Sequence, residues 1–130
     1  MEENNAQRQY IRYPLGLEAT AVIGNKPPIK RCLIHTISHS GASMNLLVRE
    51  EILAGQEIML GIMFPERKIP INVIVKLKWV DIIQWDDQFN AAAGGVIEAI
   101  EDEDRNTLLD YAFKQVMASE KKEAAGPNQE

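Results

Sequence analysis

Two arginines near the start of this sequence are well suited to bind an anion. Arg8 and Arg12 stand four residues apart in the stretch "RQYIR". Arginine presents a planar fork of donors that fits phosphate oxygens or the O6/N7 edge of guanine, and its flat face can stack on a base. Two such groups on one segment would make a clamp for a guanine nucleotide, although arginines at this spacing are also common as surface charges.

A second polar stretch, "HTISHSGASMN", begins at His35 and contains Thr36, Ser38 and Gly41. Its hydroxyl groups can donate to a phosphate or a base, and the glycine permits a positive φ that would turn backbone N–H groups toward an anion. A polar β-turn would use the same residue types. In a straight strand His35 and His39 lie on the face opposite Thr36, and we expect both to be solvated.

Strands must position these groups, because apolar and polar residues alternate from about residue 15 to residue 99. The alternation predicts strands over 15–24, 29–38, 42–48, 56–64, 69–83 and 91–100, with a turn at "GNKPP". In the longest of these, Trp79 continues the apolar face and is expected in the core. We expect the glycines of "AAAGGVIEAI" to let another backbone or a ligand approach closely. Met59 and Met63 are expected in the core or barrel lining.

The period changes after residue 100, where apolar residues from Leu108 to Met117 are spaced three and four apart. This spacing predicts an amphipathic helix over about 102–118, and the acids that precede it suit the helix dipole. We expect residues 1–7 to form a flexible N-terminus and 119–130 a disordered tail, because neither has apolar periodicity. The fold class is therefore all-β with a terminal helix. Six or seven antiparallel strands close into a barrel that hides their edges.

Length and composition exclude several function classes. The 130 residues suit one domain, and no apolar run approaches the ~20 residues of a membrane span, so we expect no membrane insertion. A net charge of −5 argues against a DNA or RNA binder. However, Lys26, Lys30 and Arg31 join the two early arginines in a local basic region that a small anion could use. The polar N-terminus lacks a secretory pattern, which favours a cytoplasmic protein.

Few residues of this sequence suit a metal site or a catalytic nucleophile. The one cysteine, Cys32, lies in an apolar strand and is expected to fill the core, and two histidines without a CxxC pattern do not suit a zinc site. No nucleophile elbow or phosphate-cradling loop is present in the sequence. We therefore expect no metal, no cofactor and no enzymatic activity.

The two polar stretches, together with the order of strands and helix, resemble the PilZ domain family from about Gln7 to Met117. In that family the motifs RxxxR and D/NxSxxG bind the bacterial second messenger cyclic di-GMP on the outside of a six-stranded antiparallel β-barrel. The resemblance therefore implies a PilZ-like domain over 8–118 whose ligand is cyclic di-GMP.

Carried over residue by residue, the resemblance implies that Arg8, Arg12, Ser38 and Gly41 contact cyclic di-GMP. Thr36 stands where the family has Asp or Asn. A threonine hydroxyl is shorter than a carboxylate and uncharged, so it cannot reproduce a two-acceptor contact to guanine. Loss of one charge-assisted hydrogen bond costs about 1.5 to 3 kcal/mol, roughly ten- to a hundredfold in affinity.

The leading hypothesis is a cytoplasmic bacterial cyclic di-GMP receptor that couples nucleotide binding to an unidentified protein partner in motility, biofilm or exopolysaccharide control. The alternative is a PilZ-like interaction adaptor that has lost the nucleotide. Its docking surface would be the helix from Leu109 to Met117 or the face carrying Met59 and Met63. Thr36 favours the adaptor, whereas the intact RxxxR favours the receptor.

Overall fold

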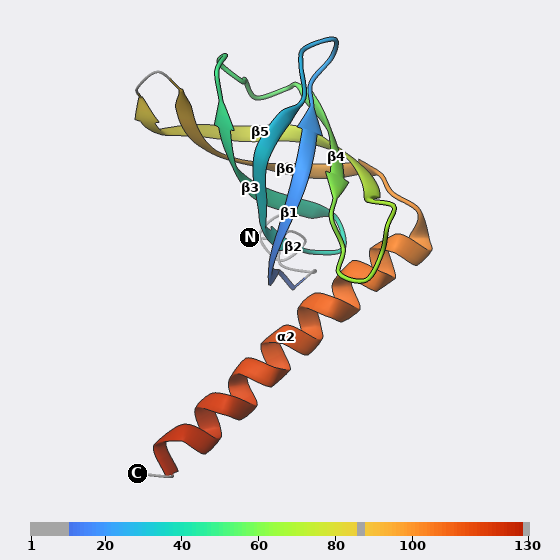
Figure 1. Ribbon diagram of the computed structural model, residues 1–130, viewed down its shortest axis with the longest axis vertical. Coiled ribbons are helices and arrows are strands. Elements are labelled where there is room, and N and C mark those ends of the chain that lie inside the picture. The colour runs from blue at the N-terminus through green and yellow to red at the C-terminus, as the bar shows by residue number, and fades with distance from the viewer. Residues whose placement is uncertain (1–10, 86–87, 129–130) are drawn as a thin grey trace, which may run out of the picture.

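The computed structural model describes residues 11–85 and 88–128, which form a barrel of strands and one long helix (Figure 1). Arg8 and the expected flexible segment 1–7 lie outside the described residues. The elements are β1 (Tyr13–Val22), β2 (Ile29–Ile37), β3 (Gly41–Val48), β4 (Glu57–Ile62), β5 (Ile71–Trp85), β6 (Phe89–Ala99) and α2 (Asp102–Asn128). The six predicted strands are each present within a few residues of the expected limits.

The strands pair antiparallel in the order β1-β2-β3-β6-β5-β4, and pairing of β1 with β4 closes the barrel. This closing contact runs from Ala19 opposite Ile62 to Val22 opposite Met59. A closed barrel leaves fewer exposed strand edges to associate with other chains. The predicted architecture, an antiparallel barrel followed by a helix, is confirmed with six strands.

Alternate residues of each strand fill the barrel, as the period of two predicts. Leu15, Ile34, Met44, Leu60 and Val75 are buried in one core with similar side chains from the other strands. Cys32 belongs to this core, and burial raises the pKa of its thiol to about 12. The expectation that Cys32 fills the core is confirmed.

Three side chains expected in the interior are exposed instead. Met59 and Met63 are 52% and 49% exposed, because they alternate with the inward-facing residues of β4 and its continuation. Trp79 is 40% exposed. The reason is a register shift in the β5–β6 pairing between Leu77 and Trp79, where one extra residue reverses the alternation. Val80, not Trp79, packs against the core beyond this bulge.

Helix α2 packs its first turns against β1 and β2, and then projects away from the barrel (Figure 1). Leu108 and Ala112 are fully buried at this contact, and Phe113 meets the ring of Tyr13 edge to face at 6.0 Å. A second ring pair, Phe64 with Tyr111, packs at 5.2 Å. These contacts position the helix beside the start of β1.

The helix continues past its expected end at 118 and reaches Asn128. The expectation of a disordered tail from 119 is therefore wrong for the segment up to Asn128. Glu, Lys and Ala dominate this segment, and all three have high helix propensity, so it can be helical without an apolar face. Within the described part of the chain, no helix combines the length and apolarity that crossing a membrane requires.

Candidate functional site

Four of the five predicted binding residues line one cavity of about 420 Å³ on the outside of the barrel. They are Arg12, Thr36, Ser38 and Gly41; Arg8 lies outside the described residues. We call this cavity the Arg12 pocket. The described residues that line it are Arg12, Thr36, Ser38, Ser40, Gly41, Ala42, Ser43, Lys78, Trp79, Gly95 and Val96.

A bulge in β2 directs Thr36 toward this pocket. Without the bulge, alternation from Ile34 would point Thr36 into the core. The β2–β3 register shifts between Ile34 and Thr36, so that Ile37 becomes the next inward residue. Thr36 then lies opposite Ser43, and the Thr36 Oγ1 and Ser43 Oγ atoms are 2.6 Å apart, a hydrogen bond in which either hydroxyl can donate. The strand is therefore irregular at His35, whereas the prediction for His35 and His39 assumed a straight strand.

Ser38 stabilises the turn between β2 and β3. The Gly41 backbone N–H donates to Ser38 Oγ at 3.0 Å, and the Ser38 N–H donates to the Gly41 carbonyl at 2.9 Å. The side chain is only 5% exposed, although Ser38 lines the pocket. Its hydroxyl therefore holds the pocket wall in shape, a role that the motif by itself did not predict.

Gly41 is needed for a close approach between strands, not for a positive φ. Its φ lies outside the left-handed region, contrary to the sequence-based expectation. A Cβ on Gly41 would lie 2.9 Å from the carbonyl oxygen of Gly95, and a Cβ on Gly95 would lie 1.9 Å from the carbonyl oxygen of Lys76. The predicted role of the glycines in "AAAGGVIEAI", close backbone approach, is confirmed.

Sequence reasoning missed two pocket residues on β5, Lys78 and Trp79. Both are exposed, because the bulge after Leu77 places them consecutively outside the core. Gly94 leaves room for the indole, since a Cβ there would lie 2.6 Å from Trp79 Nε1. The glycine pair on β6 was the sequence signal that could have placed Trp79 outside the core, because glycines opposite a tryptophan leave space for its ring.

The charge of the Arg12 pocket is positive. Arg12 and Lys78 are the two charged residues among the described ones that line it, and neither forms an ion pair with a described residue. Uncompensated cations beside hydroxyl groups and an exposed indole suit an anionic ligand with an aromatic part. Among the described residues, no three His, Cys, Asp or Glu side chains are grouped closely enough to hold a metal ion.

Comparisons with known proteins agree with this fold. Residues 6–114 match the family model described as the PilZ domain. The comparison with curated proteins returns no match. Among solved structures, the Bacillus subtilis inhibitor of motility (MotI/DgrA) has a similar fold, with a TM-score of 0.67 and 20% sequence identity. That match covers 86% of this chain and 52% of the other, so this chain spans about half the length of the solved relative.

The matched region of the family model includes "RQYIR", the turn between β2 and β3, the whole barrel and the first turns of α2. It covers far more than half of the chain, and the observed barrel and helix agree with the fold of the solved relative. The chain therefore belongs to the PilZ domain family.

Proposed function

We propose that this domain is a cyclic di-GMP receptor that couples binding in the Arg12 pocket to interaction with a protein partner. The observation that carries the proposal is the convergence of Arg12, Thr36, Ser38 and Gly41 on one cavity. These residues come from the lead-in to β1 and from the β2–β3 hairpin, which are separated in sequence. Family membership supports a receptor or adaptor, and the pocket supports the receptor.

The chemistry of the pocket matches the parts of cyclic di-GMP. The ligand carries two negatively charged phosphodiesters and two guanine bases. Arg12 and Lys78 supply cations for the phosphates, and the exposed face of Trp79 offers a platform for a base. Base stacking on an aromatic side chain contributes about 1 to 3 kcal/mol per base. Arg8 would complete the clamp from the preceding segment.

Thr36 sets the expected strength of binding. Its hydroxyl is already hydrogen bonded to Ser43, and neither group is charged. A carboxylate at this position could accept from Ser43 and also attract Arg12. Thr36→Asp should therefore tighten cyclic di-GMP binding, by roughly tenfold for one added charge-assisted hydrogen bond.

Binding would be communicated to α2 through Tyr13. This residue follows Arg12 directly, and its ring packs edge to face against Phe113 of the helix, with ring planes at 88°. Binding of the nucleotide by Arg12 would thus change a contact on which the helix rests. Tyr13→Ala should leave nucleotide affinity nearly unchanged and abolish any ligand-induced change in hydrogen exchange of α2.

Calorimetric titration of the purified chain with cyclic di-GMP tests the proposal. A ligand with a 10 µM dissociation constant would be about 90% bound at about 100 µM nucleotide, so absence of heat there contradicts the receptor function. Arg12→Ala should remove most of the binding. Lys68→Ala is the matched control, because it removes the same charge from an exposed residue outside both cavities described for this chain. Equal loss in both variants would indicate attraction by overall charge instead of this site.

Tryptophan fluorescence gives a second test of the site. The chain contains two tryptophans, and Trp85→Phe leaves Trp79 as the sole indole. If a guanine stacks on Trp79, saturating cyclic di-GMP should quench the emission of this variant. Calorimetric binding without any change in emission would show that the base lies elsewhere.

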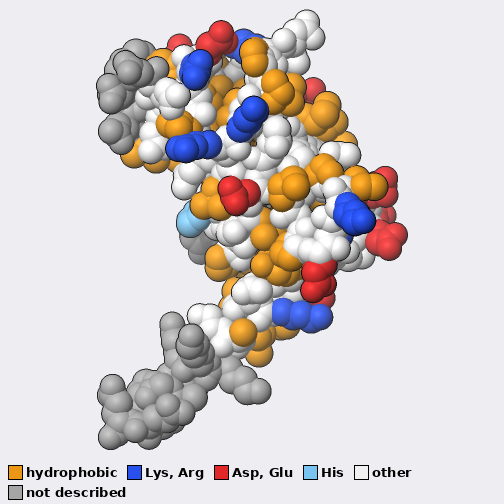
Figure 2. Space-filling model, in the orientation of Figure 1, with side chains coloured by type: hydrophobic (Ala, Val, Ile, Leu, Met, Phe, Trp, Pro, Cys, Tyr) orange, Lys and Arg blue, Asp and Glu red, His pale blue; other side chains and the backbone are white. Residues whose placement is uncertain are grey.

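A second function, protein docking without nucleotide, is favoured by the exposed apolar residues of α2. Phe113 and Met117 are 46% and 48% exposed one turn apart on the helix. Figure 2 shows apolar side chains on the described part of this helix outside the barrel. If no cyclic di-GMP binds, and Met117→Glu abolishes the interaction with a partner identified by crosslinking, the adaptor is the correct function.

A further inference from the structure

A second and larger cavity, of about 680 Å³, lies at the other end of the barrel. It is lined by the turn between β1 and β2, the start of β2, the end of β3 and the loop that follows. The Arg12 pocket instead adjoins the end of β2 and the start of β3. The two cavities are therefore separated by the length of these strands. We call the larger one the Arg49 pocket.

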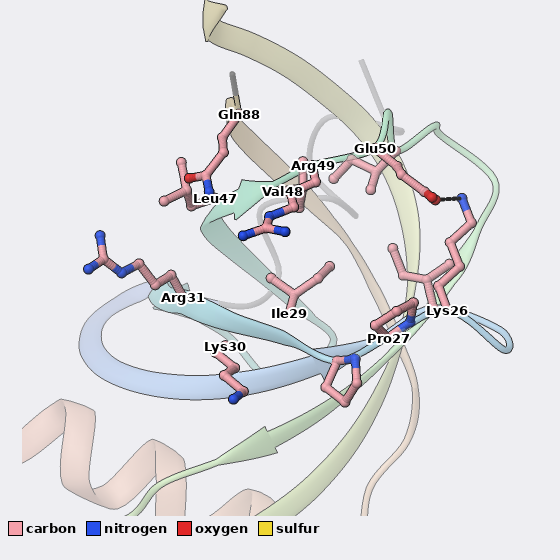
Figure 3. Close-up of a pocket in the computed structure, with 13 residues that line it drawn as sticks. Lys26, Pro27, Ile29, Lys30, Arg31, Leu47, Val48, Arg49, Glu50 and Gln88 are labelled. Carbon is pink, nitrogen blue, oxygen red and sulfur yellow. Dashed lines mark ion pairs between the residues drawn. The ribbon is translucent and has the colours of Figure 1, made fainter. Parts of the chain in front are cut away.

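The Arg49 pocket concentrates positive charge on an acidic chain. Among the described residues, four cations and one acid line it, although the net charge of the chain is −5. Arg49 lies near the middle of the ring of lining residues in Figure 3, with Arg31 on one side and the ion pair of Lys26 with Glu50 on the other. Figure 2 shows Lys and Arg side chains over this end of the barrel, away from α2.

Most of these cations lack an acidic partner within the described part of the chain. Lys26 Nζ lies 3.1 Å from the Glu50 carboxylate, but Lys30, Arg31 and Arg49 form no ion pair with any described residue. Like charges gathered without counter-charges repel one another, and an anion placed among them removes that repulsion. Arg31 and Arg49 present forks of donors suited to bidentate contact with phosphate.

Apart from Gln88, the remaining walls that the described residues form are apolar. Ile29, Leu47 and Val48 line it beside the arginines, and Pro27 and Pro28 form part of the turn wall. A ligand that uses both surfaces must have an anionic end and an apolar or aromatic end. The volume lies within the roughly 300 to 1,000 Å³ that is usual for small-molecule pockets.

We propose that the Arg49 pocket is a second ligand site, which takes a small organic phosphate. The phosphate lies against the guanidinium groups of Arg49 and Arg31, and the apolar part lies against Ile29 and Leu47. Glu50 opposes the phosphate and competes with it for Lys26. This site shares no lining residue with the Arg12 pocket and does not depend on cyclic di-GMP binding.

The first test titrates the full chain with ATP and, separately, with inorganic pyrophosphate, observed by NMR. ATP should shift the amide signals of Ile29, Leu47 and Gln88, and should bind more tightly than pyrophosphate because only ATP has a ring for the apolar wall. Arg49→Ala should weaken ATP binding at least about tenfold. Arg12→Ala should leave the shifts of Ile29, Leu47 and Gln88 unchanged. Shifts confined to the Arg12 pocket would overturn the proposal.

Two matched pairs of variants separate a defined site from general attraction by charge. They are Arg49→Ala with Lys68→Ala, and Glu50→Gln with Glu51→Gln. Lys68→Ala removes one exposed cation outside the pocket and should leave ATP affinity within about twofold, as expected for a screened surface charge. Glu50→Gln should tighten binding about threefold or more by freeing Lys26, whereas Glu51→Gln, at the neighbouring exposed acid, should not. Equal effects within either pair would overturn the proposal.

The phosphate could belong to a soluble molecule or to a lipid headgroup, and sedimentation with vesicles distinguishes these sources. Retention by phosphatidylglycerol vesicles but not by phosphatidylcholine vesicles, lost in Arg49→Ala, identifies a lipid phosphate. ATP binding without vesicle retention identifies a soluble ligand. If neither probe binds in an Arg49-dependent manner, the pocket is not a phosphate site.

Discussion

The two pockets of this barrel are built in different ways. The Arg12 pocket is formed by backbone irregularities: bulges in β2 and β5, a hydrogen-bonded serine turn, and the contact of Gly41 with Gly95. The Arg49 pocket is formed by a proline-containing turn, the adjoining ends of β2 and β3 and the loop after β3, which carry long charged side chains. In the Arg12 pocket the path of the main chain positions short side chains, whereas in the Arg49 pocket charged groups gather at the ends of flexible side chains.

The difference has a consequence for mutations. Substitutions that alter the walls of the Arg12 pocket should change the stability of the fold together with ligand binding, because the same backbone contacts hold the strands in register. Substitutions of the cations in the Arg49 pocket should change binding alone, because exposed charges contribute little to the free energy of unfolding. The following variants test this contrast, from the largest expected effect to the smallest.

Gly95→Ala should produce the largest loss of stability. The added Cβ would lie 1.9 Å from the Lys76 carbonyl oxygen, a backbone atom that cannot move without displacing β5. We expect the free energy of unfolding to fall by about 3 kcal/mol or more in urea denaturation. Gly61→Ala is the control, because the nearest atom to its Cβ would be a Pro70 side-chain carbon at 3.5 Å, an ordinary van der Waals contact; equal losses would contradict the close approach.

Ser38→Ala should have an intermediate effect. It removes a buried hydroxyl that accepts from the Gly41 N–H and leaves that donor without its partner. The expected loss is about 1 to 3 kcal/mol, measured by denaturation without ligand. Ser40→Ala, two residues away and exposed, should change stability by less than about 0.5 kcal/mol. If Ser38→Ala were equally mild, Ser38 would be available to contact the ligand directly.

Lys26→Ala should have a small effect, in keeping with the loose construction of the Arg49 pocket. Its ion pair with Glu50 joins the β1–β2 turn to the β3–β4 loop, but both side chains are largely exposed. The expected loss of stability is below about 1 kcal/mol and should decrease further in high salt. A loss as large as that of Ser38→Ala would remove the contrast between the two pockets.

Glu98→Ala, outside both pockets, should have the smallest effect on stability. Its effect is detected in the pH dependence of Glu57. A hydrogen bond with the Glu98 carboxyl group raises the pKa of Glu57, and the like charge of Glu98 adds to this shift. The folded state therefore holds the Glu57 proton more tightly than the unfolded state. The resulting stabilisation is present below the unfolded pKa and is lost as pH rises through the folded pKa. In Glu98→Ala, NMR titration should give Glu57 a lower pKa; an unchanged value would contradict this coupling.

Much of the fold follows from local sequence patterns. The alternation in "LGLEATAVIG" and the other apolar stretches predicted all six strands, and the spacing around Leu108 predicted the start of the helix. These predictions succeed because one buried face per strand or helix imposes a fixed period on the sequence. The predicted end of the helix was wrong because helix propensity, not apolar periodicity, governs the residues beyond the barrel.

The exposure of Trp79 could not be predicted in this way. Its position continues an apolar face, and only the shifted pairing of β5 with β6 brings it outside the core. Thr36 shows the same effect, because strict alternation would bury it beside Ile34 and the β2 bulge turns it outward. In both cases one strand has one residue more than its partner, and the pairing of the two strands decides where this extra residue lies.

The sequence by itself determined the strands, the helix, the burial of Cys32 and the membership of Arg12, Thr36, Ser38 and Gly41 in a recognisable pattern, because these depend on residue type and short-range spacing. Tertiary structure decided that Lys78 and Trp79 join them, that Ser38 supports the turn, and that a second cationic cavity forms at the far end of the barrel. The physical reason is that bulges, close glycine contacts and cavities arise between strands distant in sequence, where register and packing decide which side chains meet.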